Sequence, residues 1–511
     1  MSRILDGGRL VRDPQPFHLS DDLVEVIGLG DFYRYLGVRE GYQPDIKSNL
    51  ALSQAIERIE RLFKSSLTPD QKLIALRRFE MPRLTYLLRL RRFPQVELKK
   101  VDRTVRRCVR LAYRLPVRTC TAFFHSPCGS GGLGIPSLAS EGDILTVTQA
   151  YKMLTAPDGR VVAVARGRLE AVALGTASER QGISALAAFL SGGPALHSAP
   201  LPGLDLFVRT RQAAARLGLK FTSNADAELC VTSGGKTLAP RNRCVITRTL
   251  HQQQNARWRG VWASNHDQGK TVSAHTLYAY SNNWVMKTGA LNIAERRFAM
   301  KSRLNLLPVK KVRSRFNKYP QPNLRCCRCG HTEETLPHVL NHCKPVMEQI
   351  LRRHDRIMGE VLSHIPQQRF TRISVDEVCL AHAQQTGENL RPDVILEQAG
   401  GISVVDFACP FDNGADALEL AATRKVDKYR ELCENLARAT GKRVSFHTYI
   451  IGSLGSYAKG NSTTLAALGI AGRLQTQVAR NTCNLALKGS HEVWQSWCRG
   501  IPTRSVEHIT A

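Results

Sequence analysis

The sequence has no uninterrupted apolar stretch near the ~18 residues that a membrane-spanning helix needs. Residues 1–30 also lack the apolar core and cleavage site of a secretory signal. Acidic residues are in short supply, because 43 Asp and Glu stand against 72 Lys and Arg. We therefore expect a soluble protein with no membrane partner, whose surface repels basic partners and attracts polyanions.

The formal net charge of +29 makes nucleic acid the natural partner of this chain. Composition alone does not identify that partner, since ribosomal, membrane-surface and heparin-binding proteins share a basic balance. The 14 cysteines are scattered except for a group between residues 326 and 343. This distribution predicts reduced thiols with one metal cluster rather than a disulfide framework, and hence an intracellular compartment. A nuclear location suits a DNA partner.

A chain of 511 residues is too long for one ordinary core and predicts two to four domains. From about Ser48 to Leu115, apolar residues recur at three- and four-residue steps, which predicts amphipathic helices. Residues 135–300 are Ala-rich, are broken by Gly and Pro, and are interpreted as a helical connecting region.

The polar faces of the helices between residues 48 and 115 carry far more arginines than nearby acids can neutralise. Such faces can follow a phosphate backbone. A second basic segment, residues 301–318, either contacts nucleic acid or serves as a nuclear-import signal. The alternative for both is a solvated basic surface without a ligand. The residues predicted to bind nucleic acid are Arg77, Arg78, Arg103, Arg107, Lys310 and Lys311.

The cysteine group has the spacing of a zinc module: Cys326-x-x-Cys329, eight residues, His338, four residues, Cys343. A Cys-x-x-Cys turn supplies two thiolates, and a following helix supplies the other two ligands of a tetrahedral site. Cys327 and His342 remain possible substitutes, because the segment offers more than four donors. Four protein ligands leave no open coordination position, so we expect a structural Zn²⁺.

Two aspartates flank a second feature, a predicted β-hairpin. Apolar, β-branched runs at 394–396 and 402–405 are separated by Gly400-Gly401, which suits a tight turn. If these glycines form the turn, Asp393 and Asp406 are diagonal neighbours on one face; a shift of one residue makes them directly opposed. In either register two carboxylates can bracket one hard cation, and Mg²⁺ is the expected ion.

A helix is predicted over residues 419–432, with Lys425 and Lys428 on one face. A lysine close to the metal could orient the attacking water or neutralise charge on a phosphate. A buried strand over 444–451 gives the order strand, strand, helix, strand. We predict Asp393, Asp406, Lys425 and Lys428 as catalytic residues, the two aspartates also binding the ion. The alternative is that such aspartates cap a turn or pair with arginine.

These motifs together resemble the carboxyl-terminal half of the polyprotein of non-LTR retrotransposons that carry a restriction-like endonuclease, especially those that insert into ribosomal RNA genes. Tyr35-Leu36-Gly37 and the Gly131–Pro136 segment are similar to the end of a reverse-transcriptase palm and its thumb. Residues 303–308 resemble the linker motif before the zinc knuckle. Arg391-Pro392-Asp393 with Asp406 resembles the core of a PD-(D/E)xK nuclease.

The resemblance implies a multidomain, mainly α-helical chain with a metal-dependent DNA endonuclease that nicks target double-stranded DNA, so that the new 3′ end primes reverse transcription of the element RNA. Ala408 stands where the PD-(D/E)xK pattern has lysine, and the resemblance assigns that role to the following helix, with Lys425 or Lys428. The implied domains are the palm end (1–47), a helical thumb (48–136), a helical linker (137–318), a CCHC zinc knuckle (319–346) and an α/β restriction-like endonuclease (347–511).

A polymerase of this kind also needs a Tyr/Phe-x-Asp-Asp pair, and the sequence has none, so we expect a fragment that does not copy RNA alone. Two other functions remain open. The first is a zinc-dependent nucleic-acid-binding protein in which a decayed nuclease core only folds. The second is a zinc module that acts as a protein-interaction element.

Overall fold

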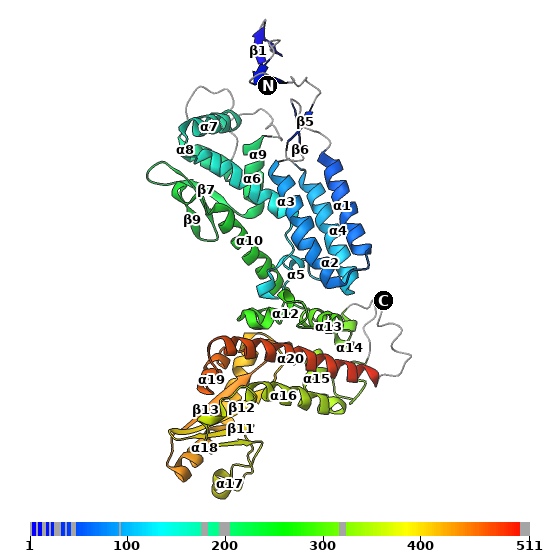
Figure 1. Ribbon diagram of the computed structural model, residues 1–511, viewed down its shortest axis with the longest axis vertical. Coiled ribbons are helices and arrows are strands. Elements are labelled where there is room, and N and C mark those ends of the chain that lie inside the picture. The colour runs from blue at the N-terminus through cyan, green and yellow to red at the C-terminus, as the bar shows by residue number, and fades with distance from the viewer. Residues whose placement is uncertain are drawn as a thin grey trace. The chain divides into compact units, whose positions relative to one another are not determined.

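The computed structural model describes residues 48–90, 93–174, 182–193, 205–315 and 323–500, and six short strands before residue 48 (Figure 1). Most of the predicted palm segment, residues 1–47, therefore lies outside the described residues. Its strands pair as three antiparallel hairpins: β1 (Arg3–Asp6) with β2 (Arg9–Arg12), β3 (Phe17–Leu19) with β4 (Asp22–Val24), and β5 (Phe32–Tyr35) with β6 (Val38–Gly41).

The chain divides into two compact units. Unit 1 comprises residues 1–108 and 136–251, and unit 2 comprises residues 109–135 and 252–511. The structure is mainly helical, as predicted from the sequence. Among the described helices, none combines the length and the apolar character that crossing a bilayer requires. The five predicted domain boundaries stay predictions.

Helices form most of unit 1, where apolar periodicity predicted them. Leu52, Ala55 and Ile59 point inward from the first helix, because residues three and four apart share a helix face. Thr68 caps the second helix through a reciprocal capping box with Gln71. The elements are α1 (Ser48–Lys64), α2 (Pro69–Ala75), η1 (Leu76–Glu80), α3 (Met81–Leu90), α6 (Leu138–Leu154), α7 (Gly159–Leu174), α8 (Ile183–Leu190), α9 (Leu206–Leu217) and η3 (Pro240–Asn242). Two further helices, α4 (Gln95–Tyr113) and α10 (Ile246–Ala263), begin in unit 1 and end in unit 2.

The expectation of a purely helical linker over 137–318 is wrong in one part. Residues 220–238 form a three-stranded antiparallel sheet of β7 (Lys220–Ser223), β8 (Leu229–Ser233) and β9 (Lys236–Leu238). Gly234 and Gly235 both have positive φ, and this pair of angles suits the two-residue turn between β8 and β9. Phe221 and Val231 pack with the helices of unit 1, so apolar burial stabilises the sheet.

Short elements open unit 2 and lead to the cysteine cluster. They are α5 (Thr121–His125), η2 (Cys128–Ser130), α11 (Val272–His275), η4 (Ala279–Asn282), α12 (Asn283–Met286), α13 (Ile293–Arg303) and α14 (Lys310–Ser314). Arg303, in the linker motif, is buried and donates to the carbonyl oxygens of Leu454 and Ser281 and to Asn282. This side chain ties the linker motif to the loop at residue 454, far away in the sequence.

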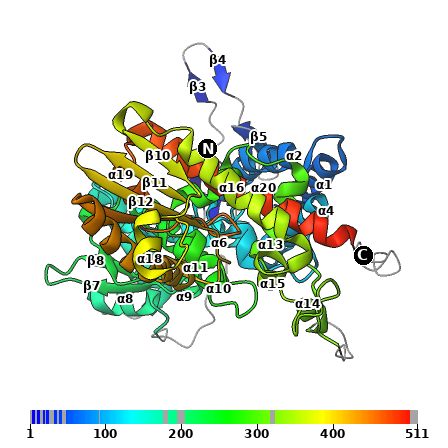
Figure 2. The same ribbon diagram turned by 90° about the horizontal axis from the view of Figure 1, so that it is seen from below.

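The rest of unit 2 is built on one four-stranded sheet, in the order β10-β11-β12-β13. The first two pairings are antiparallel and the last is parallel. Figure 2 shows β10, β11 and β12 side by side. The strands are β10 (Arg372–Val375), β11 (Val394–Gln398), β12 (Gly401–Ala408) and β13 (Val444–Ile450). The helices are α15 (Leu336–Asn341), η5 (Lys344–Val346), α16 (Met347–Leu362), η6 (Gln367–Arg369), α17 (Leu380–Thr386), α18 (Ala415–Thr440), α19 (Asn461–Ala467) and α20 (Gly472–Arg499).

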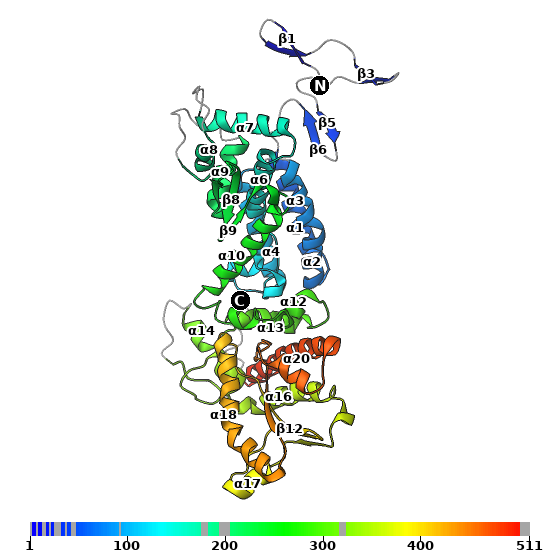
Figure 3. The ribbon, with the colours of Figure 1, turned by 90° about the vertical axis from the view of Figure 1, so that its left-hand side faces the viewer.

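Alternate residues of β12 face two different helix layers. Val405 and Phe407 pack with α16 and α20, whereas Ile402 and Val404 pack with α18 (Figure 3). This alternation follows from the two-residue period of a strand, and it buries both faces of β12. The predicted order of strand, strand, helix, strand is confirmed by β11, β12, α18 and β13. After β13 the chain forms two further helices, α19 and α20.

Candidate functional sites: a cysteine–histidine cluster and a carboxylate hairpin

The cysteine-rich segment begins with a tight turn that brings two thiols together. The N–H of Cys326 donates to the carbonyl oxygen of His331 at 2.8 Å, and the N–H of Gly330 donates to that of Cys326 at 2.9 Å. Gly330 has a φ of +73°, a left-handed conformation that glycine adopts without steric cost. The turn thereby places Cys326 and Cys329 on one side.

The other two predicted ligands come from α15 and from the residue that follows it. Thr335 caps α15 by accepting the N–H of His338 at 3.3 Å. The helix ends at Asn341, and Cys343 stands just before η5, whose first residues are Lys344-Pro345. The helix end lets Cys343 turn back toward the imidazole of His338.

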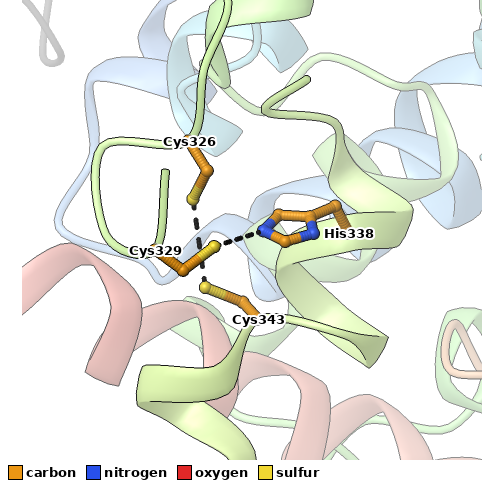
Figure 4. Close-up of side chains that lie close together, drawn as sticks. All are labelled: Cys326, Cys329, His338 and Cys343. Carbon is orange, nitrogen blue, oxygen red and sulfur yellow. Dashed lines mark hydrogen bonds between the residues drawn. The ribbon is translucent and has the colours of Figure 1, made fainter. Parts of the chain in front are cut away.

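The four side chains converge in the structure (Figure 4). The Sγ atoms of Cys326 and Cys343 are 3.9 Å apart, and Sγ of Cys329 lies 3.2 Å from Nε2 of His338. All four ligand atoms lie within 4.8 Å of one another. Tetrahedral Zn²⁺ with Zn–S distances of ~2.3 Å holds its sulfur ligands about 3.8 Å apart. The donor set and its spacing therefore fit a structural Zn²⁺.

The local backbone favours a thiolate at the first ligand. Burial acts to raise the pKa of Cys326, but hydrogen bonds from the N–H groups of Arg328 and Cys329, together with those from the side chains of Cys329 and Trp497, lower the pKa. The alternative donor Cys327 is exposed and lies outside the cluster. Partial desolvation by neighbouring atoms and the nearby Glu334 carboxylate raise the pKa of Cys327 to about 12, so it stays a protonated thiol.

Sequence reasoning missed Glu334, which holds the knuckle to the preceding helix. Its buried carboxylate accepts the N–H groups of Lys310 at 2.8 Å and of Cys327 at 2.9 Å. A glutamate between two cysteines gives no signal of this role in the sequence, because its partners are backbone groups. A buried carboxylate is stable only when such donors satisfy it.

The carboxylate hairpin has the second of the two registers that the sequence allowed. Gln398 pairs with Gly401 and Val394 with Val405, so the turn is Ala399-Gly400, and the next pair in this register is Asp393 opposite Asp406. A Cβ at position 401 would lie 2.6 Å from the carbonyl oxygen of Arg443. Gly401 is therefore needed for the approach of β13 rather than for the turn. The two aspartates come directly beyond the last pair of the ladder, Val394 with Val405.

Asp406 is the buried member of the pair, with a residue exposure of 1%. Burial raises its pKa, and the negative charge of Asp393 raises it further, while Lys425 opposes both effects. Nζ of Lys425, on α18, lies 2.6 Å from Oδ2 of Asp406. The ion pair compensates only one of the two carboxylates, and a cation between them would relieve the repulsion.

Asp393 has a different environment at the start of β11. Its Oδ2 accepts the N–H of Phe407 at 2.6 Å and lies 3.3 Å from Nε2 of His354, on α16. Burial acts to lower the pKa of His354, but the hydrogen bond to Asp393 and its charge prevail and raise the pKa to about 9. His354 went unnoticed in the sequence, because nothing in the spacing of an amphipathic helix relates it to an aspartate 39 residues later.

The second candidate lysine, Lys428, is used elsewhere. Its Nζ lies 3.1 Å from the hydroxyl of Tyr429 and 4.6 Å from the centre of the Tyr429 ring. That hydroxyl donates to the carbonyl oxygen of Arg391 at 3.0 Å. This hydrogen bond holds the backbone two residues before Asp393. Of the two lysines predicted from helix spacing, the structure therefore places Lys425 on the carboxylate.

The residues predicted to contact nucleic acid are divided between the two units. In unit 1, Arg78, Arg103 and Arg107 are exposed and Arg77 is half-buried; Arg107 pairs with Glu60 at 2.5 Å. In unit 2, Nζ of Lys311 pairs with Glu333 at 2.6 Å, and that of Lys310 donates to the carbonyl oxygen of Arg325 at 2.8 Å. These two lysines join α14 to the cysteine cluster, and their role in binding nucleic acid stays a prediction.

No protein-family model matches the chain. It is 25% identical over 495 residues to a "Retrovirus-related Pol polyprotein from type-1 retrotransposable element R2" of Popillia japonica, which covers 96% of this chain and 86% of that protein. A protein of the same description from Nasonia vitripennis is 22% identical over 421 residues, or 82% of this chain and 33% of that protein.

A third relative is the "Retrovirus-related Pol polyprotein from type-2 retrotransposable element R2DM" of Drosophila melanogaster, 34% identical over 128 residues, a quarter of this chain and 12% of that protein. The alignments to the first two relatives extend over most of the chain, so the likeness is not confined to one motif. They confirm the resemblance predicted from the motifs: the homologues of this chain are Pol polyproteins of R2 non-LTR retrotransposable elements.

Proposed function

We propose that this chain is a divalent-metal-dependent endonuclease that nicks double-stranded DNA, with its catalytic centre on the hairpin of β11 and β12. One observation carries the proposal: Asp393 and Asp406 come directly beyond Val394 and Val405, the last pair of the β11–β12 ladder, and Lys425 lies 2.6 Å from Asp406. Carboxylates can hold an ion that activates water and polarises a phosphodiester, and a lysine beside them can stabilise the charge that develops on the phosphate.

Asp393 and Asp406 would hold Mg²⁺, which prefers few carboxylate ligands and several waters. When bound, Mg²⁺ supplies charge stabilisation at the phosphate and lowers the pKa of a bound water. Lys425 neutralises charge beside Asp406 and is placed to orient the attacking water. His354 positions Asp393 through the 3.3 Å contact, and Tyr429 positions the backbone at Arg391. The Cys326–Cys343 cluster would hold Zn²⁺ as a structural ion.

A second candidate function is that of a nucleic-acid-binding protein whose nuclease core folds but does not cleave DNA. The observation that favours it is the ion pair of Lys425 with the nearly inaccessible Asp406, which compensates the charge of the buried carboxylate without a metal ion. In this case the raised pKa of Asp406 reports its burial and the nearby charge of Asp393, without a role in catalysis. The two functions differ in whether bound DNA is cut.

The wider activities that the resemblance implies are part of the same proposal. The nick would provide the 3′ end for reverse transcription of element RNA, and the protein would act in the nucleus. The chain spans a third of the Nasonia vitripennis relative, so activities of the whole polyprotein do not follow from this chain.

A plasmid assay distinguishes the two functions. The purified chain is incubated with supercoiled plasmid and either Mg²⁺ or Ca²⁺, because Ca²⁺ occupies carboxylate sites without the strict octahedral geometry of Mg²⁺. We expect conversion to the relaxed circle with Mg²⁺ only, while both ions leave DNA retention in a gel-shift assay unchanged. Retention without relaxation in any divalent ion, including Mn²⁺, would assign the chain to the binding function.

The two lysines of α18 provide a matched pair of variants. Lys425→Ala should lower the nicking rate by about a hundredfold, the scale on which a preorganised charge acts in a transition state. Lys428→Ala should change the rate by less than about threefold, because Nζ of Lys428 contacts Tyr429 rather than a carboxylate. Both rates are measured at saturating Mg²⁺, with the unfolding midpoint as a check on folding. A larger loss in Lys428→Ala would contradict the assignment of Lys425.

A further inference from the structure

A groove of about 910 Å³ runs along α20 in unit 2, on a side that the proposed nuclease centre does not use. One wall is the polar face of α20, with side chains at helical spacing from Arg473 to Lys488. The other wall includes α12 and the turn after it, up to Ala290 (Figure 1). No step of the proposed hydrolysis involves these residues.

Four basic side chains line the groove: Lys287, Arg473, Arg480 and Lys488. Within the part of the chain that the structure describes, none of the four has an ion-pair or hydrogen-bond partner for its side chain. The acid in the lining is Glu360, whose Oε1 accepts from Asn481 at 2.7 Å and lies 3.9 Å from Nδ1 of His364. The groove therefore has an excess of three positive charges, and a polyanion is the ligand that neutralises them.

The remaining lining favours the backbone of a nucleic acid over its bases. It includes amide and hydroxyl groups such as those of Thr476, Gln477 and Asn484, and the described residues that form it include no aromatic side chain. Grooves that hold single strands stack bases on aromatic rings, whereas contacts to phosphate and sugar use cations, amides and hydroxyls. From Arg473 to Lys488 the helix rises about 22 Å, the length over which one strand of a duplex presents about six phosphates.

The opposite face of α20 connects the groove to the proposed nuclease centre. Val478, Cys483 and Ala486 pack in one core with Val394 of β11 and Phe407 of β12. These strand residues adjoin Asp393 and Asp406 in the sequence. A duplex held on the polar face of α20 would therefore be placed relative to the carboxylates by a packed layer rather than by a loop.

We propose that this groove binds the sugar–phosphate backbone of double-stranded DNA and holds the duplex that the proposed nuclease centre cuts. The inference rests on the proposed function for the identity of the duplex, and it adds a sequence-independent binding surface. The cations of the groove bind phosphates, and the amides and hydroxyls contact phosphate and sugar oxygens.

The test measures binding without cleavage. A short fluorescein-labelled DNA duplex is titrated by anisotropy with Asp406→Asn protein, without added divalent ion, and with the same protein carrying Arg473→Gln, Arg480→Gln and Lys488→Gln. At about 0.1 M salt we expect the triple change to weaken binding at least about tenfold. The negative slope of the logarithm of the binding constant against the logarithm of the salt concentration should become less steep by about 2.7. This is the change expected when three phosphates are no longer neutralised by the protein.

A charge-matched control removes three arginines that already have acidic partners: Arg352, Arg356 and Arg430 pair with Glu348, Glu492 and Asp427. Their replacement by glutamine lowers the net charge equally and should leave the Kd within about threefold, since exposed ion pairs are already locally neutral. Arg473→Lys with Arg480→Lys keeps the charge and should retain binding. Unfolding midpoints exclude misfolding as the cause of a loss.

Equal affinity of the groove variant and the control would overturn the proposal. The proposal would also be overturned if the groove variant lost affinity for duplex RNA or single-stranded DNA but kept its affinity for duplex DNA. The groove would then serve a different ligand. A failure of plasmid nicking leaves this measurement intact, as binding is recorded in cleavage-deficient protein. Loss of duplex binding in the groove variant alone supports the proposal whether or not the hairpin cuts DNA.

Discussion

Replacing Asp406 with asparagine should reduce plasmid nicking by on the order of a thousandfold, the largest effect that we expect of any single substitution. Asparagine preserves the shape of the side chain but removes the charge that pairs with Lys425 and is repelled by Asp393. The proposed ion then loses one of its two protein ligands, and Lys425 loses its partner. The rate is measured as relaxed circle formed per unit time at saturating Mg²⁺.

Asp427→Asn is the matched control for this substitution. Asp427 lies on α18 two residues after Lys425, but its side chain is 57% exposed and pairs with Arg430. Its replacement should leave the nicking rate within about threefold of wild type. The double variant Asp393→Asn, Asp406→Asn should be about as slow as each single variant, because groups that act as one unit are not additive. Undiminished nicking by Asp406→Asn would remove the hairpin from the reaction.

Loss of zinc should have the second-largest effect, and this effect is on stability. The cluster lies within an apolar core: Cys326 and Cys343 pack with Leu340, Val493 and Trp497, the last two from α20. Cys326→Ser should abolish a zinc stoichiometry of about one per chain and lower the free energy of unfolding of this region by several kcal/mol, because metal binding contributes directly to folding. Native mass spectrometry and thermal unfolding measure the two quantities.

Cys327→Ser is the control one residue away. Its thiol is exposed and outside the cluster, so this variant should keep its zinc and its unfolding midpoint. For the histidine ligand, His338→Ala should lose zinc, and His342→Ala is its control, which should keep zinc. Retention of zinc by Cys326→Ser, or its loss from Cys327→Ser, would show that the ligand set is wrong.

The ligand spacing in the sequence predicted the geometry of the cysteine–histidine cluster more fully than that of any other site. Cys-x-x-Cys closes a local turn, and His338 and Cys343 are five residues apart, so the arrangement depends on short-range backbone structure. The choice between Cys326 and Cys327 needed the structure, since both adjoin the same turn. Orientation of the backbone toward His331 and Glu334 decides which thiol faces inward.

The carboxylate hairpin was predictable as an element but not in its register. Gly400-Gly401 allowed two turns, and each gave a different relation between Asp393 and Asp406. The parallel strand β13 decides between them, because Arg443 of the segment before it passes so close to position 401 that a side chain there would collide. That contact joins residues more than forty positions apart.

The sequence by itself determined the local chemistry of this protein: the helical periodicity, the excess of basic residues, the zinc-ligand spacing and two aspartates at the ends of neighbouring strands. Only the tertiary structure decided that Lys425 rather than Lys428 meets Asp406, that His354 contacts Asp393, and that four basic side chains share a groove along α20. The physical reason is the sequence separation of the residues that make each contact. Turns, caps and helix faces depend on residues a few positions apart, whereas ion pairs and grooves depend on which elements pack together.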